Sequence, residues 1–312
     1  MRFATFSTSQ LPKPHLGIVQ GDELLDADLA GQALNVNIPD QLQELIDHYA
    51  EFGSALQTIS EKAAGRRFTE VKTYTDIGAA HKLSEVRLFA PLPYPRKNVM
   101  AVGLNYKAHA EETAAIRKRS GDAPSYPIFF TKATTSIIGP YDNIVIDPAA
   151  STKIDWEVEL GVVIGKRGKN ISEGEALSYV FGYTVINDVS ARDLQSNHVQ
   201  YFKGKSLDTT CPIGPWIVTA DELADPANLP LRLLVNGQIK QDGNTSDMIF
   251  PVPTLIASLA AGMTLEPGDI IATGTPSGVG FTRQPPEFLK PGDIVEAVVE
   301  GIGTLRNPVV GL

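Results

Sequence analysis

The stretch from residue 154 to 160 reads Ile-Asp-Trp-Glu-Val-Glu-Leu and alternates acidic with apolar side chains. As a β-strand it would place Asp155, Glu157 and Glu159 on one face and the apolar side chains on the other. Glu157 and Glu159 would then stand roughly 6.6 Å apart along the strand, so that both carboxylates could contact one ion. The spacing permits a site for a hard cation, although acids on the outer face of an antiparallel strand can equally be solvated.

A third carboxylate follows a second strand-like run, Phe181–Asn187, which is succeeded by Asp188. If the two strands are neighbours, about 4.8 Å apart, Asp188 could supply a further oxygen ligand. Oxygen ligands alone favour Mg²⁺, Mn²⁺ or Ca²⁺ over zinc. We therefore expect a divalent-metal site whose remaining positions are open to water or to a chelating substrate.

The elements that must position these acids belong to a β-rich region. Beyond residue 90, short apolar runs alternate with turn signals, which predicts many short strands, the first over residues 98–102. Asn236-Gly237 stands between two such runs and predicts a hairpin, because both residue types tolerate positive φ. The two Pro-Gly-Asp phrases at residues 267–269 and 291–293 are predicted as turns.

The first 90 residues predict a smaller α+β unit. Short strands are expected in the first 35 residues, and a helix over Gln41–Lys62. The proline-spaced segment Ala90–Lys97 then indicates a stiff connector. We place a boundary near residue 90, with residues 1–90 as a small amino-terminal α+β domain and residues 91–312 as the catalytic domain.

Composition excludes several classes of function. The chain has 312 residues and a formal net charge of -9, and it has no basic patch or basic amphipathic helix, which argues against binding to nucleic acid or an anionic membrane. Its single cysteine, Cys211, cannot form an intramolecular disulfide. The first residues lack an apolar signal segment, and no run approaches the ~20 apolar residues of a membrane span. We expect a cytoplasmic protein.

The segment Lys107–Arg119 consists of helix formers but has almost no apolar stripe, so a helix there would be weakly anchored. With Ser120-Gly121-Asp122 behind it, it is a candidate lid. His109 and Glu112 lie at positions i and i+3, where the carboxylate could orient the imidazole as a general base that activates water. On a solvated helix the same two residues would simply be surface residues.

Further residues could contact a substrate. Lys205 beside three acids and a metal would offset their charge and stabilise an oxyanion or enolate, or it could be a solvated turn lysine. The loop 273–280 could present N–H groups and the Thr275 hydroxyl to an anion. Arg192 and Gln195 follow the third acid closely and either could hold a substrate, although Arg192 could instead pair with an acid.

Five motifs occur in chain order: Gly-Leu-Asn-Tyr-x-x-His-x-x-Glu, Asp-Trp-Glu-x-Glu-Leu, Asn-Asp-x-x-Ala-Arg-Asp-x-Gln, Gly-Lys-Ser and Thr-Gly-Thr-Pro-x-Gly-Val-Gly. Together they resemble the fumarylacetoacetate hydrolase (FAH) family, over roughly residues 92–312. The first 90 residues look like the variable amino-terminal domain of longer members. The resemblance implies a predominantly β, α+β fold, with a mixed β-sandwich roll as the catalytic domain, usually in a homodimer.

By position, the resemblance also implies roles for individual residues. The implied ligands of Mg²⁺ or Mn²⁺, with Ca²⁺ as a further option, are Glu157, Glu159 and Asp188. Asp155 is not a ligand in that pattern. The implied catalytic residues are His109, Glu112 and Lys205. The implied substrate contacts are Tyr106, Arg192, Gln195, Gly274 and Thr275. Many members that act on small acylpyruvates or oxaloacetate carry a basic residue where this chain has Leu104, so the recognition of the substrate carboxylate departs from theirs.

The leading hypothesis is a divalent-metal-dependent hydrolase that cleaves a C–C bond in an acylpyruvate or other 1,3-diketo acid, a small anionic substrate, through a metal-stabilised enolate. His109 would deprotonate the attacking water, and Lys205 would stabilise the enolate. The alternative is an oxaloacetate decarboxylase or keto–enol tautomerase, or an isomerase or dehydratase on a related 2-oxo acid, because one metal–enolate site serves them all. A non-catalytic metabolite-binding protein is a further alternative.

Overall fold

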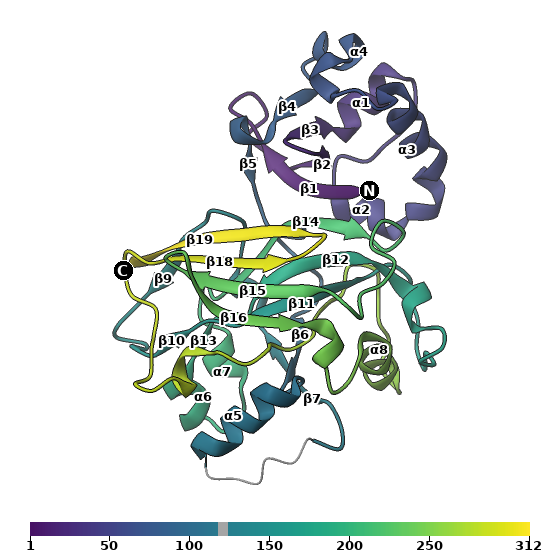
Figure 1. Cartoon of the computed structure of the whole chain (residues 1–312). Helices are drawn as coiled ribbons and strands as arrows, with labels where there is room; N and C mark the ends of the chain where they lie inside the picture. The colour runs from purple at the N-terminus through teal and green to yellow at the C-terminus, as the bar shows by residue number, and fades with distance from the viewer. Residues whose placement is uncertain (118–123) are drawn as a thin grey trace.

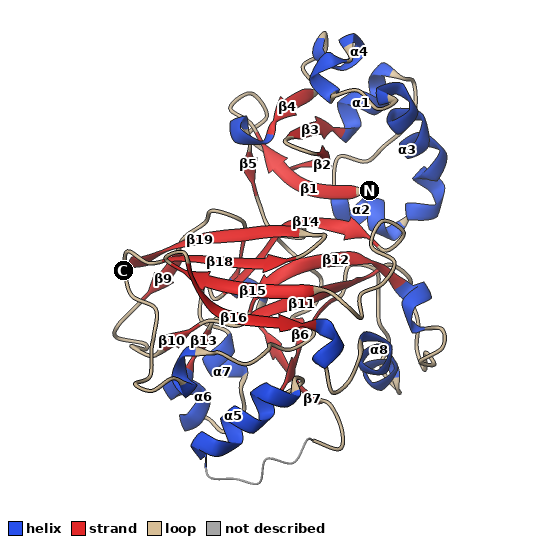
Figure 2. Ribbon diagram, in the orientation of Figure 1, coloured by secondary structure: helices blue, strands red, loops and turns tan. Residues whose placement is uncertain are grey.

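The computed structural model describes residues 1–117 and 124–312. The end of the predicted lid helix and the Ser120-Gly121-Asp122 segment lie outside the described residues. Two sheets form the body of the molecule, and the first 90 residues add strands to the larger sheet and helices beside them (Figure 1). Helices cover this amino-terminal part and the opposite end of the molecule (Figure 2). The predicted predominantly β, α+β fold is confirmed.

The larger sheet has 12 strands among the described residues, in the order β4-β3-β2-β1-β14-β12-β11-β17-β6-β7, with β5 beside β1 and β8 beside β14. Its strands are β1 (Arg2–Ser7), β2 (His15–Gln20), β3 (Glu23–Asp26), β4 (Ala80–Lys82), β5 (Arg87–Leu88), β6 (Val99–Gly103), β7 (Ile128–Lys132), β8 (Ile137–Ile138), β11 (Val158–Ile164), β12 (Val180–Asn187), β14 (Cys211–Thr219) and β17 (Ile270–Ala272). The strand expected at residues 98–102 is thus β6.

The smaller sheet has the order β16-β15-β18-β19-β9. Its strands are β9 (Ile144–Ile146), β15 (Pro230–Val235), β16 (Gln238–Asn244), β18 (Ile294–Val299) and β19 (Gly303–Gly311), and a separate pair is formed by β10 (Ile154–Asp155) and β13 (Ser190–Ala191). The predicted hairpin at Asn236-Gly237 is confirmed, because it joins β15 to β16 with φ of 52° and 75° at its two residues.

The α-helices lie mainly in the first 90 residues and around the later loops. They are α1 (Ala27–Ala33), α2 (Leu42–Asp47), α3 (Tyr49–Ala63), α4 (Lys72–Thr75), α5 (Lys107–Arg117), α6 (Arg192–Asn197), α7 (Phe202–Lys205) and α8 (Val252–Ala260). The single helix predicted over Gln41–Lys62 is in fact α2 and α3, because the backbone leaves the helical conformation at His48. The first 35 residues include α1 as well as strands, since the Asp26 carboxylate accepts the Leu29 N–H and begins a helix.

The two faces of the larger sheet bury different partners. One face packs on the smaller sheet, where Val158 and Leu160 of β11 meet Leu231 and Leu233 of β15 in one apolar core. The other face carries a second core, in which Phe181, Ile213 and Ile217 lie with apolar residues of α2 and α3. This second core and the β1–β14 pairing both join residues before position 90 to residues after it. The division into domains at that residue stays a prediction.

The single strand predicted at residues 154–160 is wrong, because the chain leaves the ladder at Trp156 and Glu157, between β10 and β11. Side chains replace the missing backbone partners. The Trp156 N–H donates to the Asp155 carboxylate at 2.8 Å, and the Glu157 N–H donates to Oδ1 of Asn187 at 3.1 Å. On either side of this break the two strands have different partners: β10 pairs with β13, and β11 pairs with β12.

Candidate active site

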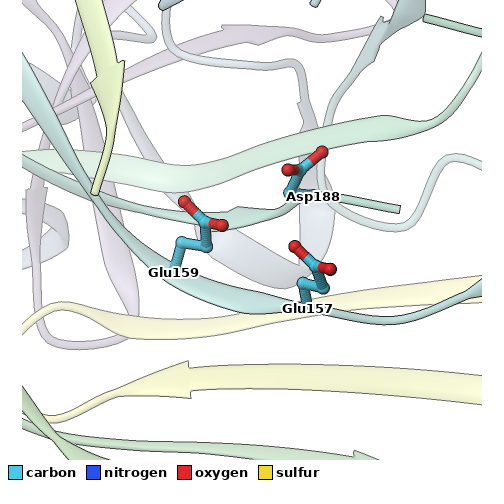
Figure 3. A group of neighbouring side chains, drawn as sticks. All are labelled: Glu157, Glu159 and Asp188. Atoms are coloured by element: carbon cyan, nitrogen blue, oxygen red, sulfur yellow. The ribbon is translucent and has the colours of Figure 1, made fainter. Parts of the chain in front are cut away.

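Three buried carboxylates meet where β11 and β12 lie side by side. The strands pair antiparallel, with Glu159 opposite Ile186, and Asp188 follows the end of β12. One ligand atom each from Glu157, Glu159 and Asp188 lie within 4.8 Å of one another (Figure 3). The side chains are buried, with exposed fractions of 5%, 1% and 0%. The interpretation of the two glutamates as a solvated face is therefore wrong.

Three cations surround this carboxylate triad. Nζ of Lys205 lies 2.8 Å from Glu157 and 2.6 Å from Asp188. Nζ of Lys132 lies 2.6 Å from the other oxygen of Asp188 and donates to the Val189 carbonyl at 3.1 Å. Nη2 of Arg192 lies 2.7 Å from Glu157. Buried charges are tolerated only when paired in this way.

The cations reach Glu157 and Asp188 but leave Glu159 without a positive partner among the described residues. Burial would raise the pKa of Glu157, but Lys205 and Arg192 lower it to about 2. Burial, with the negative charges of Asp188 and Glu157, raises the pKa of Glu159 well above its usual range. Glu159 instead accepts the Gly274 N–H at 2.7 Å.

The triad fits a divalent metal. All of its donors are carboxylate oxygens, the ligands that hard divalent cations prefer, and they lie on or directly beside the paired strands β11 and β12. A dication among them would offset the repulsion that Glu159 experiences from its two neighbours. The residues that would hold it are those predicted from the sequence.

The segment after Asp188 positions two of these cations, Arg192 on α6 and Lys205 on α7. α7 lies so close to α6 that a Cβ on Gly204 would stand 2.5 Å from the backbone nitrogen of Gln195. Only glycine fits there, and it brings the next residue, Lys205, to the triad. On α6, Nε of Arg192 lies 2.8 Å from Asp155, its Nη1 donates to Gln195 at 3.1 Å, and its guanidinium stacks on Phe281 at 4.4 Å.

His109 and Glu112 form the predicted pair on α5. Nδ1 of His109 lies 2.8 Å from Oε1 of Glu112, and because a carboxylate only accepts, that nitrogen carries the proton. The Gly278 N–H donates to both carboxylate oxygens of Glu112 at 3.2 Å. His109 is 5% exposed, so the pair is not a solvated surface feature.

One cavity brings most of the predicted residues together. It has a volume of about 30 Å³, room for roughly two water molecules. The polar or charged side chains that line it include His109, Glu157, Arg192, Gln195, Lys205 and Thr275. Its less polar walls include Val102, Leu104, Phe130, Tyr201 and Phe281.

Two predicted substrate contacts lie elsewhere. Tyr106 is 1% exposed in the apolar core, its hydroxyl has no hydrogen-bond partner among the described residues, and it borders a different surface depression. Gly274 does not line the cavity either, since its N–H is directed to Glu159. Their contact with substrate stays a prediction.

The loop 273–280 differs from expectation in what it binds. The Thr275 hydroxyl donates to the Val158 carbonyl at 2.9 Å and accepts from Gln241 at 2.8 Å. The N–H groups of Gly274, Gly278 and Gly280 all donate to carboxylates of the protein itself. The Thr275 hydroxyl and these three N–H groups thus already have hydrogen-bond partners within the protein, and their contact with a substrate anion stays a prediction.

Sequence reasoning missed two residues of the site. Lys132 stands at the end of the apolar strand β7 with its ammonium 0% exposed, and a lone lysine closing an apolar run was the available signal. Asp155 was set aside because it is no metal ligand, yet it anchors Arg192 beside the triad. Neither contact can be read from spacing, because both partners are distant in the chain.

Comparison with known proteins decides the family. The family model described as fumarylacetoacetate (FAA) hydrolase C-terminal matches residues 98–310. The chain belongs to this family. Its similarity to oxaloacetate tautomerase YisK of Bacillus subtilis (strain 168) is 42% identity over 309 residues, covering 97% of this chain and 99% of that protein.

Solved structures of FAH-family proteins share the whole fold. The fumarylacetoacetate hydrolase of Exiguobacterium antarcticum superimposes with a TM-score of 0.79 at 37% identity, and the alignment covers 100% of both chains. Maleylpyruvate hydrolase from Sphingobium sp. SYK-6, solved with manganese(II) and pyruvate, gives a TM-score of 0.75 at 33% identity, covering 100% of this chain and 99% of that one. The FAH fold predicted from the sequence motifs is thus confirmed, and the chain is a member of a family of enzymes.

Within the described residues, no helix combines the length and the apolar character needed to cross a membrane.

Proposed function

We propose that this FAH-family protein is a metal-dependent tautomerase that interconverts the keto and enol forms of oxaloacetate or a similarly small 2-oxo acid. The observation that carries the proposal is that one small cavity is lined both by a member of the carboxylate triad and by His109 of the His–Glu pair. A chelated 2-oxo acid could therefore meet a base. The full-length similarity to an oxaloacetate tautomerase supports this choice over the hydrolase that we first expected.

Glu157, Glu159 and Asp188 would hold Mg²⁺ or Mn²⁺, with Ca²⁺ as a weaker option. When bound, the metal would polarise the 2-oxo group and make the neighbouring carbon more acidic. The manganese in the structure of maleylpyruvate hydrolase supports a divalent ion of this kind.

His109 has the geometry of the base. Its Nδ1 proton is held by Glu112, so its Nε2 is available to take a proton from carbon 3 of the substrate. The electron pair of that C–H bond moves to the C2–C3 bond, and the charge develops on the 2-oxygen. The Lys205 ammonium stabilises this charge, and transfer of the abstracted proton from His109 to the 2-oxygen completes the enol and regenerates the base. The reverse sequence returns the keto form.

Arg192 and Gln195 would receive the substrate carboxylate. Arg192 is fixed from several sides by Asp155, Gln195 and the Phe281 ring, so little side-chain freedom is lost when it binds an anion. Arginine's planar fork suits a carboxylate.

C–C bond hydrolysis of an acylpyruvate is the second candidate, and the similarity to maleylpyruvate hydrolase favours it. In that case His109 would take a proton from water instead of from carbon. Decarboxylation, isomerisation or dehydration of a related oxo acid would use the same groups, and a non-catalytic binding protein would need the triad without the base.

The test follows enol absorbance and pyruvate release with oxaloacetate and acetylpyruvate, in the presence of Mg²⁺, Mn²⁺ or EDTA. We expect metal-dependent tautomerisation of oxaloacetate, and we expect His109→Gln to lower it by at least about 100-fold while Mn²⁺ still binds. His198→Gln changes an exposed histidine and is the control. Metal-dependent cleavage of acetylpyruvate without tautomerisation would favour the hydrolase, and loss of Mn²⁺ binding in His109→Gln would overturn the assigned role.

A homodimer and a cytoplasmic location stay predictions, as does the expectation that the partners include neither nucleic acid nor membrane. The molar mass of the purified protein by light scattering would test the first.

A further inference from the structure

Part of the cavity wall is formed by uncharged residues. It contains Leu104, Phe130 and Tyr201, whereas the cations that line the cavity among the described residues are Arg192 and Lys205. Both of these cations lie within 2.8 Å of the triad residue Glu157. Among the described residues, a substrate group that extends toward this wall would therefore meet apolar and aromatic atoms and no further positive charge.

Tyr201 is fixed in this wall from two sides. Its ring stands edge-on to Phe130, with centroids 5.5 Å apart and an angle of 73°. It also lies over Gly103, where a Cβ would stand 3.2 Å from Cε2 of Tyr201. The absence of a side chain at Gly103 lets the tyrosine ring lie close to the end of β6.

The same wall is connected to the lysine of the site. The Lys205 N–H donates to the Tyr201 carbonyl at 3.1 Å, so both residues belong to one helical turn. The Lys205 ammonium lies 5.2 Å from the centre of the Phe130 ring, which Tyr201 also contacts. The position of the Tyr201 ring and that of the cation are therefore set by the same short segment.

We propose that Tyr201 determines substrate length: its ring, held on Phe130 and Gly103, closes the cavity to 2-oxo acids with a long group beyond carbon 3. This inference rests on the proposed function and names its substrate class as short 2-oxo acids. Removal of the ring opens the wall to an extended chain. Because this part of the wall holds no cation among the described residues, we expect the opened space to accept an apolar chain and not a second carboxylate.

The test compares unreactive ligands by calorimetry on the Mn²⁺-loaded protein: pyruvate, 2-oxohexanoate and 2-oxoadipate. The last two have equal length and differ in a terminal carboxylate. In the wild type we expect pyruvate to bind at least about tenfold more tightly than either longer acid. In Tyr201→Ala, 2-oxohexanoate should gain about tenfold relative to pyruvate, and 2-oxoadipate should gain little.

Two variants separate the effect of the ring from other changes. Tyr201→Phe keeps the ring without its hydroxyl and should behave as the wild type. Phe202→Ala alters the next residue of α7, which is 47% exposed and outside the cavity, and should leave all three affinities unchanged. If Phe202→Ala matches Tyr201→Ala, or if the wild type binds 2-oxohexanoate as tightly as pyruvate, the inference is overturned.

The outcomes also distinguish this inference from the proposed function. Binding of pyruvate with no turnover of oxaloacetate would defeat the tautomerase proposal and leave the selection by Tyr201 measurable. Failure of the Mn²⁺-loaded wild type to bind any of the three acids would defeat both.

Discussion

At the scale of single residues, Asp155 organises the site without touching its centre. Its two carboxylate oxygens accept hydrogen bonds from Nε of Arg192 at 2.8 Å and from the N–H groups of Trp156, Gly280 and Phe281 at 2.8, 2.7 and 3.0 Å. One side chain thus fixes both the guanidinium and the aromatic ring beneath it. Such a buried acid is costly unless all of its lone pairs are used, as they are here.

Lys132 is expected to position Asp188 for the metal. Its ammonium lies 2.6 Å from Oδ1 of Asp188, while Lys205 lies 2.6 Å from the other oxygen. Lys132→Met removes this constraint, and we expect the affinity for Mn²⁺ to fall by about 10–100-fold, as is usual for the loss of a group that orients a metal ligand. Calorimetric titration with Mn²⁺ measures it.

Lys97→Met is the matched control, because Lys97 forms a comparable pair with Asp269 at 2.7 Å and does not contact the triad. Equal Mn²⁺ affinity in Lys132→Met and in the wild type would contradict the positioning role.

The site residues that could be predicted from the sequence are those whose partners lie only a few positions away in the chain. Glu157 and Glu159 lie two residues apart and His109 and Glu112 three, so spacing alone suggested what they could do together. Lys132 meets Asp188 across 56 positions, and no periodic pattern connects them. The strands β7 and β12, at whose ends these residues lie, are separated by three strands in the sheet, so even the strand order would not indicate that the two residues meet.

At the scale of elements, α5 is held by polar contacts at its beginning and, over residues 107–115, not by an apolar stripe. Asn105, just before the helix, donates to the carbonyls of Phe250 and Thr273 at 3.0 and 2.7 Å. Glu112, within the helix, accepts the Gly278 N–H. The sequence shows that the helix has few apolar residues, but it does not show these hydrogen bonds, because their partners are in loops distant in the chain.

Glu112 is expected to affect catalysis through His109. Glu112→Gln keeps the shape of the side chain and an oxygen for Gly278, but it removes the charge that orients and supports the imidazole. We expect kcat for oxaloacetate to fall by about 100-fold with little change in Mn²⁺ affinity. Glu111→Gln, at an exposed neighbouring position, is the control, and similar rates in the two variants would contradict the role.

His81, on strand β4, is expected to make the free energy of unfolding depend on pH. Burial lowers the pKa of His81 below its usual 6.5, although Asp26 and Glu85 partly offset this. The unfolded chain therefore takes up a proton at a higher pH than the folded chain, and the free energy of unfolding falls as pH drops below about 6.5. His81→Gln should reduce this acid-induced loss.

Urea unfolding at pH 5 and pH 7.5 checks this expectation. His48→Gln, at a largely exposed position, is the control and should leave the pH dependence as in the wild type. Identical pH dependence in the wild type and His81→Gln would show that His81 is not responsible.

At the scale of the whole molecule, the β-rich character and the FAH fold could be predicted, but the continuity of the large sheet could not. Turn signals and the order of the motifs are features of the chain read in sequence. The pairing of Arg2 with Val218 joins residues more than two hundred positions apart, and nothing local indicates it.

The shared sheet predicts that residues 91–312 will not behave as an independent domain. Removing residues 1–90 would expose the edge of β14 and the apolar side chains of Phe181, Ile213 and Ile217. We expect aggregation, because an exposed apolar strand edge pairs with other chains. Size-exclusion chromatography and circular dichroism test it, and a monodisperse fragment that binds Mn²⁺ would contradict the expectation.

The segment 188–205 contributes a triad ligand, the two cations that line the cavity among the described residues, and the tyrosine of its wall. The other two triad ligands lie on and just before β11, which this segment does not include. Exchanging residues 188–205 between relatives would therefore change the substrate specificity of the cavity. Glu157 and Glu159, which lie outside this segment, would be retained. For protein engineering, substrate specificity could thus be transferred between relatives by replacing one contiguous segment.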